Sequence, residues 1–109
     1  MSPRVNLTYP TALVLQALAT GHHHGFDIMD ATGLPSGTVY PILRRLDREG
    51  FVESGWEDHQ TAVSEQRPPR RYYEIAPAGE RLLDDAVQRY RALEQAVQRS
   101  PSRLRPSGA

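Results

Sequence analysis

Residues 36–50 decide the fold, and they read SGTVYPILRRLDREG. Apolar side chains recur in this stretch at i, i+3, i+4 and i+7, at Val39, Ile42, Leu43 and Leu46. That spacing predicts an amphipathic helix with one buried stripe. We expect Ser36 to be its N-cap and Gly50 to end it. The opposite side of the helix then presents Thr38, Tyr40, Pro41, Arg44, Arg45 and Arg48.

Two further helices are predicted before this one. Residues 9–20 carry a broad apolar face, and Gly21 stops the helix. A short helical segment follows at residues 26–31 and ends at Gly33. Residues 34–37 read Leu-Pro-Ser-Gly, which favours a turn. The order of these segments predicts a tight helix-turn-helix.

A hairpin is predicted after the helix. Residues 51–57 are β-prone, and residues 70–75, with two adjacent tyrosines, are a natural partner strand. The intervening residues 58–69 are polar and end in two prolines, so we expect a loop. Alternation places three side chains of the first strand on one face, Val52, Ser54 and Trp56. We expect Trp56, the only tryptophan, to anchor the hairpin to the core.

A long helix is predicted over residues 77–99. Its apolar residues are spaced 3, 4, 3 and 4 apart, as in a coiled-coil seam, at Leu83, Ala86, Tyr90, Leu93 and Val97. Such a helix extends beyond a small core, so we expect this seam, together with Leu13, to form a dimer interface. The alternative is that the seam packs wholly within the monomer. Residues 100–109 are rich in Pro, Ser and Arg, and we expect a disordered tail.

The element order defines the predicted fold class. It is mainly α with a two-stranded hairpin, which is the winged helix-turn-helix plan, followed by a C-terminal dimerisation helix. The predicted domains are a DNA-binding domain at 1–76, the dimerisation helix at 77–99 and the tail at 100–109. In this plan the second helix of the motif enters the major groove of DNA, and the hairpin, called the wing, lies along the backbone or in the minor groove.

The charge distribution favours double-stranded DNA as the partner. The 109 residues carry 13 acidic and 13 basic side chains, and every basic one is Arg, whose planar fork suits phosphates and guanine edges. Arginines occur both on the predicted second helix of the motif and in the wing. The predicted DNA-binding residues are Ser36, Thr38, Tyr40, Pro41, Arg44, Arg45, Arg48, Arg67, Arg70 and Arg71.

Five of these residues also have a plainer interpretation. The three arginines of the helix, Arg44, Arg45 and Arg48, could be a solvated face. Tyr40 could pack on the wing. Arg71 could lie on the sheet and pair with Glu53 or Glu57.

Other function classes have little support in the sequence. The absence of Cys excludes disulfides, zinc sites of the cysteine type and cysteine nucleophiles. The run His22-His23-His24 is expected to be a polar loop, since three consecutive side chains rarely converge on one metal ion. No glycine-rich phosphate loop or carboxylate–histidine constellation is present, so we expect no enzyme and no cofactor. Neither a secretory pattern nor a membrane-spanning stretch occurs, and we expect a cytoplasmic protein without membrane contact.

The chain also resembles the PadR family of bacterial transcriptional regulators over residues 9–98. The matching residues are Gly25-Phe26-Asp27-Ile28, the run from Ser36 to Leu43, Leu46, Gly50-Phe51-Val52, Pro68-Pro69-Arg70-Arg71-Tyr72-Tyr73 and Ala78-Gly79. The resemblance implies a homodimer on a palindromic operator, usually a repressor, whose C-terminal helix packs against the partner's N-terminal helix. In some members a small aromatic or lipophilic effector releases the DNA. The single C-terminal helix is similar to that of the small subgroup.

The chain departs from the family pattern in three places. The second helix is shorter than usual, Ala76 stands where the family often has Thr, and acidic residues dilute the charge of the wing loop. Two rival interpretations stay open at this stage. One is a winged-helix module that binds proteins and not DNA. The other is a related winged-helix regulator of the MarR or ArsR class.

Overall fold

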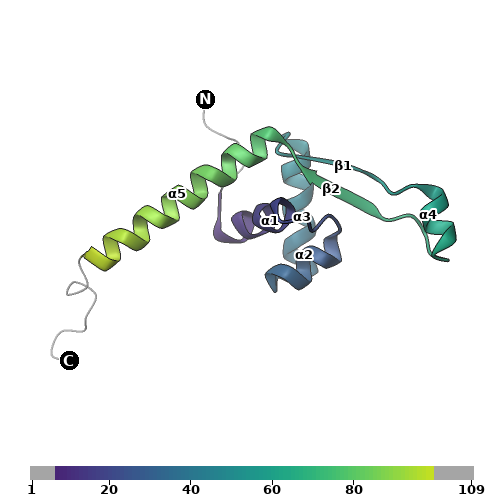
Figure 1. Cartoon of the computed structure of the whole chain (residues 1–109), viewed down its shortest axis with the longest axis horizontal. Coiled ribbons are helices and arrows are strands. Elements are labelled where there is room, and N and C mark those ends of the chain that lie inside the picture. Colours follow the sequence, from purple (N-terminus) through teal and green to yellow (C-terminus); the bar gives the residue numbers. More distant parts are fainter. Residues whose placement is uncertain (1–6, 100–109) are drawn as a thin grey trace.

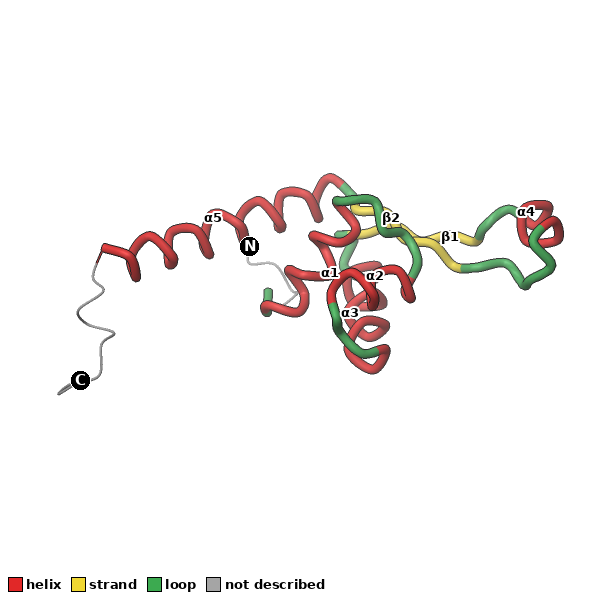
Figure 2. Tube along the Cα trace, turned by 60° about the horizontal axis from the view of Figure 1, so that its bottom comes forward, coloured by secondary structure: helices red, strands yellow, loops and turns green. Residues whose placement is uncertain are grey.

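The computed structural model describes residues 7–99. A body of three helices carries two projections, a hairpin and a long C-terminal helix, which extend from it in different directions (Figure 1 and Figure 2). The predicted fold class, a mainly helical winged helix-turn-helix, is confirmed. The predicted tail at 100–109 lies outside the described residues. Within the described range, no helix is long and apolar enough to cross a membrane.

The body consists of α1 (Tyr9–Ala19), α2 (Gly25–Thr32) and α3 (Ser36–Arg48). Gly33 follows α2 with φ of 74°, a left-handed conformation that glycine adopts without a steric penalty. This tight end allows α3 to begin three residues later. The helix-turn-helix predicted from the sequence is therefore present.

The predicted N-cap of α3 is wrong by one residue. Pro35 is the N-cap, with an extended backbone, and its carbonyl accepts hydrogen bonds of 3.0 Å from the amides of Thr38 and Val39. Ser36 is the first helical residue, and its side chain makes no capping bond. The Ser36 side chain is therefore exposed at the first turn of the helix and is not used as a cap.

The core forms where α3 meets the other elements. The predicted stripe is buried as expected, with Val39, Leu43 and Leu46 at 0 % exposure and Ile42 at 8 %. The other two helices of the body, both strands of the hairpin and the C-terminal helix also contribute to this cluster, with Val14, Leu15, Leu18, Ile28, Val52, Tyr73, Leu82 and Leu83. Burial of the apolar side chains of this cluster is the main stabilisation available to so small a body.

The hairpin pairs β1 (Val52–Trp56) with β2 (Arg71–Ile75) in antiparallel register. The histidine run fastens the loop between α1 and α2 to this hairpin. The amide of Tyr73 donates to the carbonyl of His23 at 2.8 Å, and the Nδ1 atom of His23 lies 3.0 Å from the carbonyl oxygen of Tyr73. His24 Nδ1 lies 3.1 Å from the carbonyl oxygen of Arg71. These contacts fix the wing to the helical body.

The tip of the wing is not the predicted loop. It contains a short helix, α4 (His59–Ser64), whose Ala62 is fully buried. The Thr61 hydroxyl donates to the carboxylate of Asp58 just before the helix, at 3.4 Å. Six residues are too few to show a helical period, which is why polarity and the two following prolines suggested a loop.

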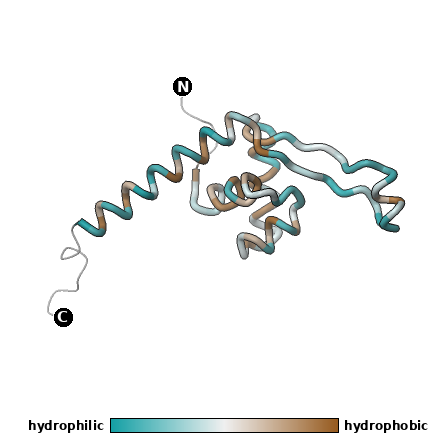
Figure 3. The backbone as a smooth tube through the Cα atoms, viewed as in Figure 1, coloured by the Kyte–Doolittle hydropathy of each residue, from teal (hydrophilic) through white to brown (hydrophobic). Residues whose placement is uncertain are grey.

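The last helix, α5 (Pro77–Arg99), starts against the body and then leaves it. Leu83 and Ala86, predicted in the dimer interface, are buried in the protomer's own core at 8 % and 1 % exposure. From Arg89 onward every described residue is exposed. Apolar residues nevertheless recur along this free part of the helix (Figure 3). The first two residues of the predicted seam therefore pack inside the protomer, and the last three, Tyr90, Leu93 and Val97, are exposed.

Candidate nucleic-acid interface

The outer side of α3 carries the predicted DNA-contacting residues. Because the buried stripe fixes the rotation of the helix, Ser36, Arg44, Arg45 and Arg48 face outward and are exposed. Thr38 and Pro41 are half-buried on the flank. The three arginines have no carboxylate partner among the ion pairs of the described residues. Their guanidinium groups are accordingly available to an anion.

A groove runs between α3 and the wing. It is lined by Arg44, Asp47, Arg48, Arg71 and Tyr73. Three guanidinium groups face one carboxylate in this groove, so the formal charge of its lining is positive although the net charge of the chain is zero. Cations from two separate elements converge on one surface, which is the arrangement required to bind a polyanion.

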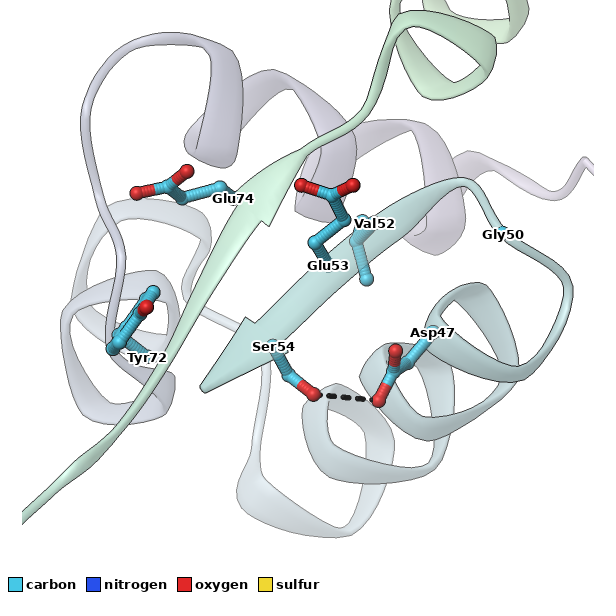
Figure 4. A pocket seen from close by; sticks show the side chains of 7 residues that line it. All are labelled: Asp47, Gly50, Val52, Glu53, Ser54, Tyr72 and Glu74. Carbon is cyan, nitrogen blue, oxygen red and sulfur yellow. Dashed lines mark hydrogen bonds between the residues drawn. The ribbon is translucent and has the colours of Figure 1, made fainter. Parts of the chain in front are cut away.

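Arg71 is held in this groove by contacts from both elements. Its Nη2 atom donates to the Ser54 hydroxyl oxygen at 2.7 Å and lies 3.8 Å from the carboxylate of Asp47. The Ser54 hydroxyl in turn donates to Asp47 at 2.7 Å (Figure 4). An acid does pair with Arg71, but it is Asp47 on α3, not Glu53 or Glu57 as sequence reasoning proposed. Glu53 alternates with Ser54 along β1 and therefore projects from the other face.

Trp56 does not anchor the hairpin to the core. Its side chain is 63 % exposed, and the Arg71 guanidinium carbon lies 5.2 Å from the centroid of its ring. Trp56 is the last residue of β1 and is not part of the apolar core cluster. The tryptophan thus belongs to the surface around Arg71.

Arg70 lies on a second contact between the wing and the helical body. Its guanidinium carbon is 4.7 Å from the centroid of Phe26, and the His24 ring stacks on the same phenyl ring at 6.0 Å. The ring of Tyr40, from α3, packs directly against Gly25 at the start of α2. A Cβ atom added at Gly25 would lie 2.4 Å from this ring. The side chains of Arg70 and Tyr40 line one small cleft with Arg71.

Arg67 is committed to the tip of the wing. Its Nη2 atom donates to Glu57 at 2.8 Å and also to Glu65, and its side chain is only 18 % exposed. The hydrogen bond from Arg67 holds the pKa of Glu57 at about 2, with help from the Arg70 amide. Glu57 likewise raises the pKa of Arg67. The predicted DNA contact of Arg67 is not supported, because two carboxylates already occupy its guanidinium.

The far face of the hairpin is acidic. Glu53 and Glu74 are directly opposite each other across the two strands and project from the same face (Figure 4). A polyanion would be repelled there, so the charges favour the side of the wing that faces α3. Among residues 7–99, no group of three or more His, Asp or Glu side chains is arranged to hold a metal ion.

The free part of α5 carries an uncovered apolar stripe. Tyr90, Leu93 and Val97 are 39 %, 61 % and 40 % exposed. The ring of Tyr9 on α1 meets Tyr90 edge-on, with 5.9 Å between ring centroids. Leu13 is half-buried on α1. Four of the six predicted interface residues, Leu13 included, thus have surface to offer a partner.

Comparison with known proteins identifies relatives of the chain. The model of the transcriptional regulator PadR-like family matches residues 14–85. A PadR family transcription regulator from hypervirulent Clostridium difficile R20291 superposes with a TM-score of 0.74 at 21 % identity, over 84 % of this chain and 97 % of that chain. A PadR-like transcription factor from Bacteroides fragilis gives 0.68 at 23 % identity, over 82 % and 86 % of the two chains.

A third structure comes from a study of how 6-hydroxynicotinic acid regulates DNA binding by Bordetella bronchiseptica BpsR. It gives a TM-score of 0.67 at 21 % identity, over 83 % of this chain and 60 % of that chain. At such identities these three likenesses show a common fold. No curated protein sequence matches the chain significantly.

Proposed function

The chain belongs to the PadR-like family of transcriptional regulators, and from this premise we propose that it is a homodimeric repressor that binds a palindromic DNA operator in the cytoplasm. Members of the family are regulators and not enzymes. The proposal therefore concerns what the chain binds, in what assembly, and what releases it.

The observation that carries DNA binding is the groove between α3 and the wing. Arg44 and Arg48 from α3 and Arg71 from β2 line it together. In winged-helix proteins the recognition helix lies in the major groove of DNA, and the adjacent wing follows the backbone. A phosphate strand entering between the two elements would meet all three guanidinium groups, while the outer side of α3 would face the base edges. A module that binds only proteins has no need of cations on both elements.

The stripe on the free part of α5 supports dimerisation with a second copy of this chain. About two heptads are marginal as an isolated coiled coil, so contacts from α1 are needed as well. Tyr9 of α1 contacts Tyr90 of the stripe, and the half-buried Leu13 follows four residues later on α1, so α1 can add apolar surface to the same interface. A two-fold dimer would present two copies of α3 to the DNA. The proposed operator is therefore palindromic, with half-sites about one helical turn of DNA apart.

The proposal includes control by a small effector. The BpsR study names 6-hydroxynicotinic acid as a regulator of DNA binding by that protein. For this chain, the exposed Tyr9–Tyr90 pair at the start of the α5 stripe offers aromatic surface to a small aromatic or lipophilic molecule. Addition of 6-hydroxynicotinic acid to the operator complex tests this directly, and DNA release is the expected result.

The experiment for DNA binding is selection of duplexes from a random pool at two salt concentrations. The wild type should enrich an inverted repeat, and less of it at the higher salt. The double variant Arg44→Ala/Arg48→Ala should lose the enrichment. Arg91→Ala is the matched control, because Arg91 is exposed on α5, far from the groove and outside the apolar stripe. No enrichment by the wild type at either salt concentration would favour the protein-binding module instead.

A further inference from the structure

Trp56 is the largest apolar side chain of the wing, and 63 % of it is exposed. It is the last residue of β1, and it pairs across the hairpin with Arg71. A single exposed apolar side chain is common on protein surfaces, so the groups that surround Trp56 decide whether it has a binding role. Trp56 is not part of the protomer's apolar core, and its ring contacts the guanidinium of its cross-strand partner Arg71 instead.

The position of Trp56 places it beside the cationic groove. Side chains alternate along a strand, so Trp56 shares its face with Ser54 and with the buried Val52. Ser54 bonds to Asp47 of α3, which shows that this face is directed toward the recognition helix. The indole therefore borders the groove where Arg71 joins the arginines of α3.

The indole and the network behind it fix the direction of Arg71. The guanidinium stacks near the ring, with 5.2 Å from its carbon to the ring centroid, and one of its nitrogens bonds to Ser54. An arginine held by a ring and a hydroxyl loses less conformational freedom when it binds a phosphate than a free one does. Most of its N–H donors are left for a ligand.

We propose that Trp56 is a DNA-contact residue, whose ring packs against the sugars of the backbone strand while Arg71 binds the adjacent phosphate. Ser54 and Asp47 are positioning residues, because they act through Arg71. The inference rests on the proposed DNA binding. A double-stranded DNA ligand fits better than a protein, since three guanidinium groups face one carboxylate in the adjacent groove. The sugars between the phosphates offer apolar surface to an aromatic side chain.

The first test uses the intrinsic fluorescence of the 109-residue chain, in which Trp56 is the one tryptophan. A mixed-sequence duplex at low salt is the probe, and binding is followed independently by sedimentation. The emission of Trp56 should change with the same midpoint as the sedimentation signal. Quenching of that emission by acrylamide, a neutral quencher, should decrease once the duplex is bound. This measurement needs no variant and so does not depend on how a variant folds.

The second test compares two exposed apolar residues of the wing. Trp56→Ala should weaken duplex binding about tenfold, the effect of losing part of the apolar burial of one large side chain, and Trp56→Phe should restore part of it. Val63→Ala is the matched control: Val63 is 60 % exposed but lies on α4 at the wing tip, and binding should stay unchanged. Unchanged thermal melting of Trp56→Ala would show that its fold is intact.

Two results would overturn the inference, and they differ. If the duplex binds while Trp56 emission, acrylamide quenching and the affinity of Trp56→Ala all stay as they are, Trp56 is outside the interface and DNA binding by the protein still stands. If the wild type binds no duplex at low salt, both the inference and the proposed function fail.

Discussion

The hydroxyl of Ser54, on the first strand of the wing, donates a hydrogen bond of 2.7 Å to the carboxylate of Asp47 on α3. This bond ties together the two elements that the proposed function brings onto one DNA duplex. Arg71 bonds to the same hydroxyl, so the three side chains form one chain of contacts from α3 to β2. The wing and α3 are thus linked by side-chain contacts in the protein alone.

Ser54→Ala should weaken operator binding without changing its salt dependence. The loss of one side-chain hydrogen bond is worth about 1 kcal/mol, or roughly fivefold in affinity, if the bond serves to place Arg71. The slope against salt should stay the same because no cation is removed, whereas Arg71→Ala should reduce it by about 0.9 per protomer. Titrations of labelled operator check this, with Ser64→Ala on α4 as the control hydroxyl. Equal affinities for Ser54→Ala and Ser64→Ala would show that the network does not position Arg71.

Leu93→Glu should dissociate the proposed dimer while the protomer stays folded. Leu93 is 61 % exposed in a single chain, so a charge there should not destabilise the core of the protomer. At a dimer interface the same charge would be buried without a partner. Light scattering should give twice the mass of one chain for the wild type and a single chain for the variant. The control Gln95→Glu adds the same charge to an exposed residue of the helix outside the stripe. A Leu93→Glu protein with the mass of the wild type would contradict the assignment.

Gly79→Ala should destabilise the protein although alanine is the better helix former. A Cβ atom at Gly79 would lie 2.1 Å from the carbonyl oxygen of Phe51, and that oxygen is held by a hydrogen bond from Ala76. We expect the free energy of unfolding to fall by about 1–3 kcal/mol, as for other overpacked sites. Gly37→Ala in α3 meets no atom within 4 Å, so it should leave stability unchanged or raise it by up to about 1 kcal/mol. Urea unfolding of both variants makes the comparison, and equal stabilities would refute the close approach of α5 to Phe51, the residue before β1.

The wing tip should lose its ion pair only in strong acid. The pKa of Glu57 is lowered from 4.5 to about 2 because Arg67 donates to its carboxylate. A lowered folded-state pKa means that the pair contributes its full stabilisation above about pH 4.5 and loses it as the pH falls toward 2. An NMR titration should therefore place the midpoint of the Glu57 carboxyl near 2. In Arg67→Gln the pKa should rise, and an unchanged midpoint in that variant would exclude the ion pair as its cause.

The body of the fold was predictable from the sequence because its signals are periodic. The apolar stripe of α3, the alternating strands and the length of α5 all repeat at the spacing of their secondary structure. The six-residue α4 has no such repeat, and it went undetected. The burial of Leu83 and Ala86 within the protomer could not be predicted from the heptad spacing either. Such spacing does not show at which residue a helix leaves its own core.

The candidate site was predicted in its residue types but not in its pairings. Arg44, Arg48 and Arg71 do line one groove, as the basic character of helix and wing suggested. Sequence reasoning took Arg67 for a free cation, because the turn of the chain that brings Glu57 and Glu65 to it depends on α4. It placed Trp56 in the core for a related reason: hydrophobicity does not reveal how far a hairpin projects.

The affinity of the wild type for its selected operator, measured over a range of salt concentrations, tests the central claim most directly. A dimer brings two grooves of three arginines each to the DNA. We predict that the logarithm of the binding constant falls linearly with the logarithm of the salt concentration, with a slope of about −5 and two chains per duplex. A slope near zero, or no duplex bound at any salt concentration, would contradict the account.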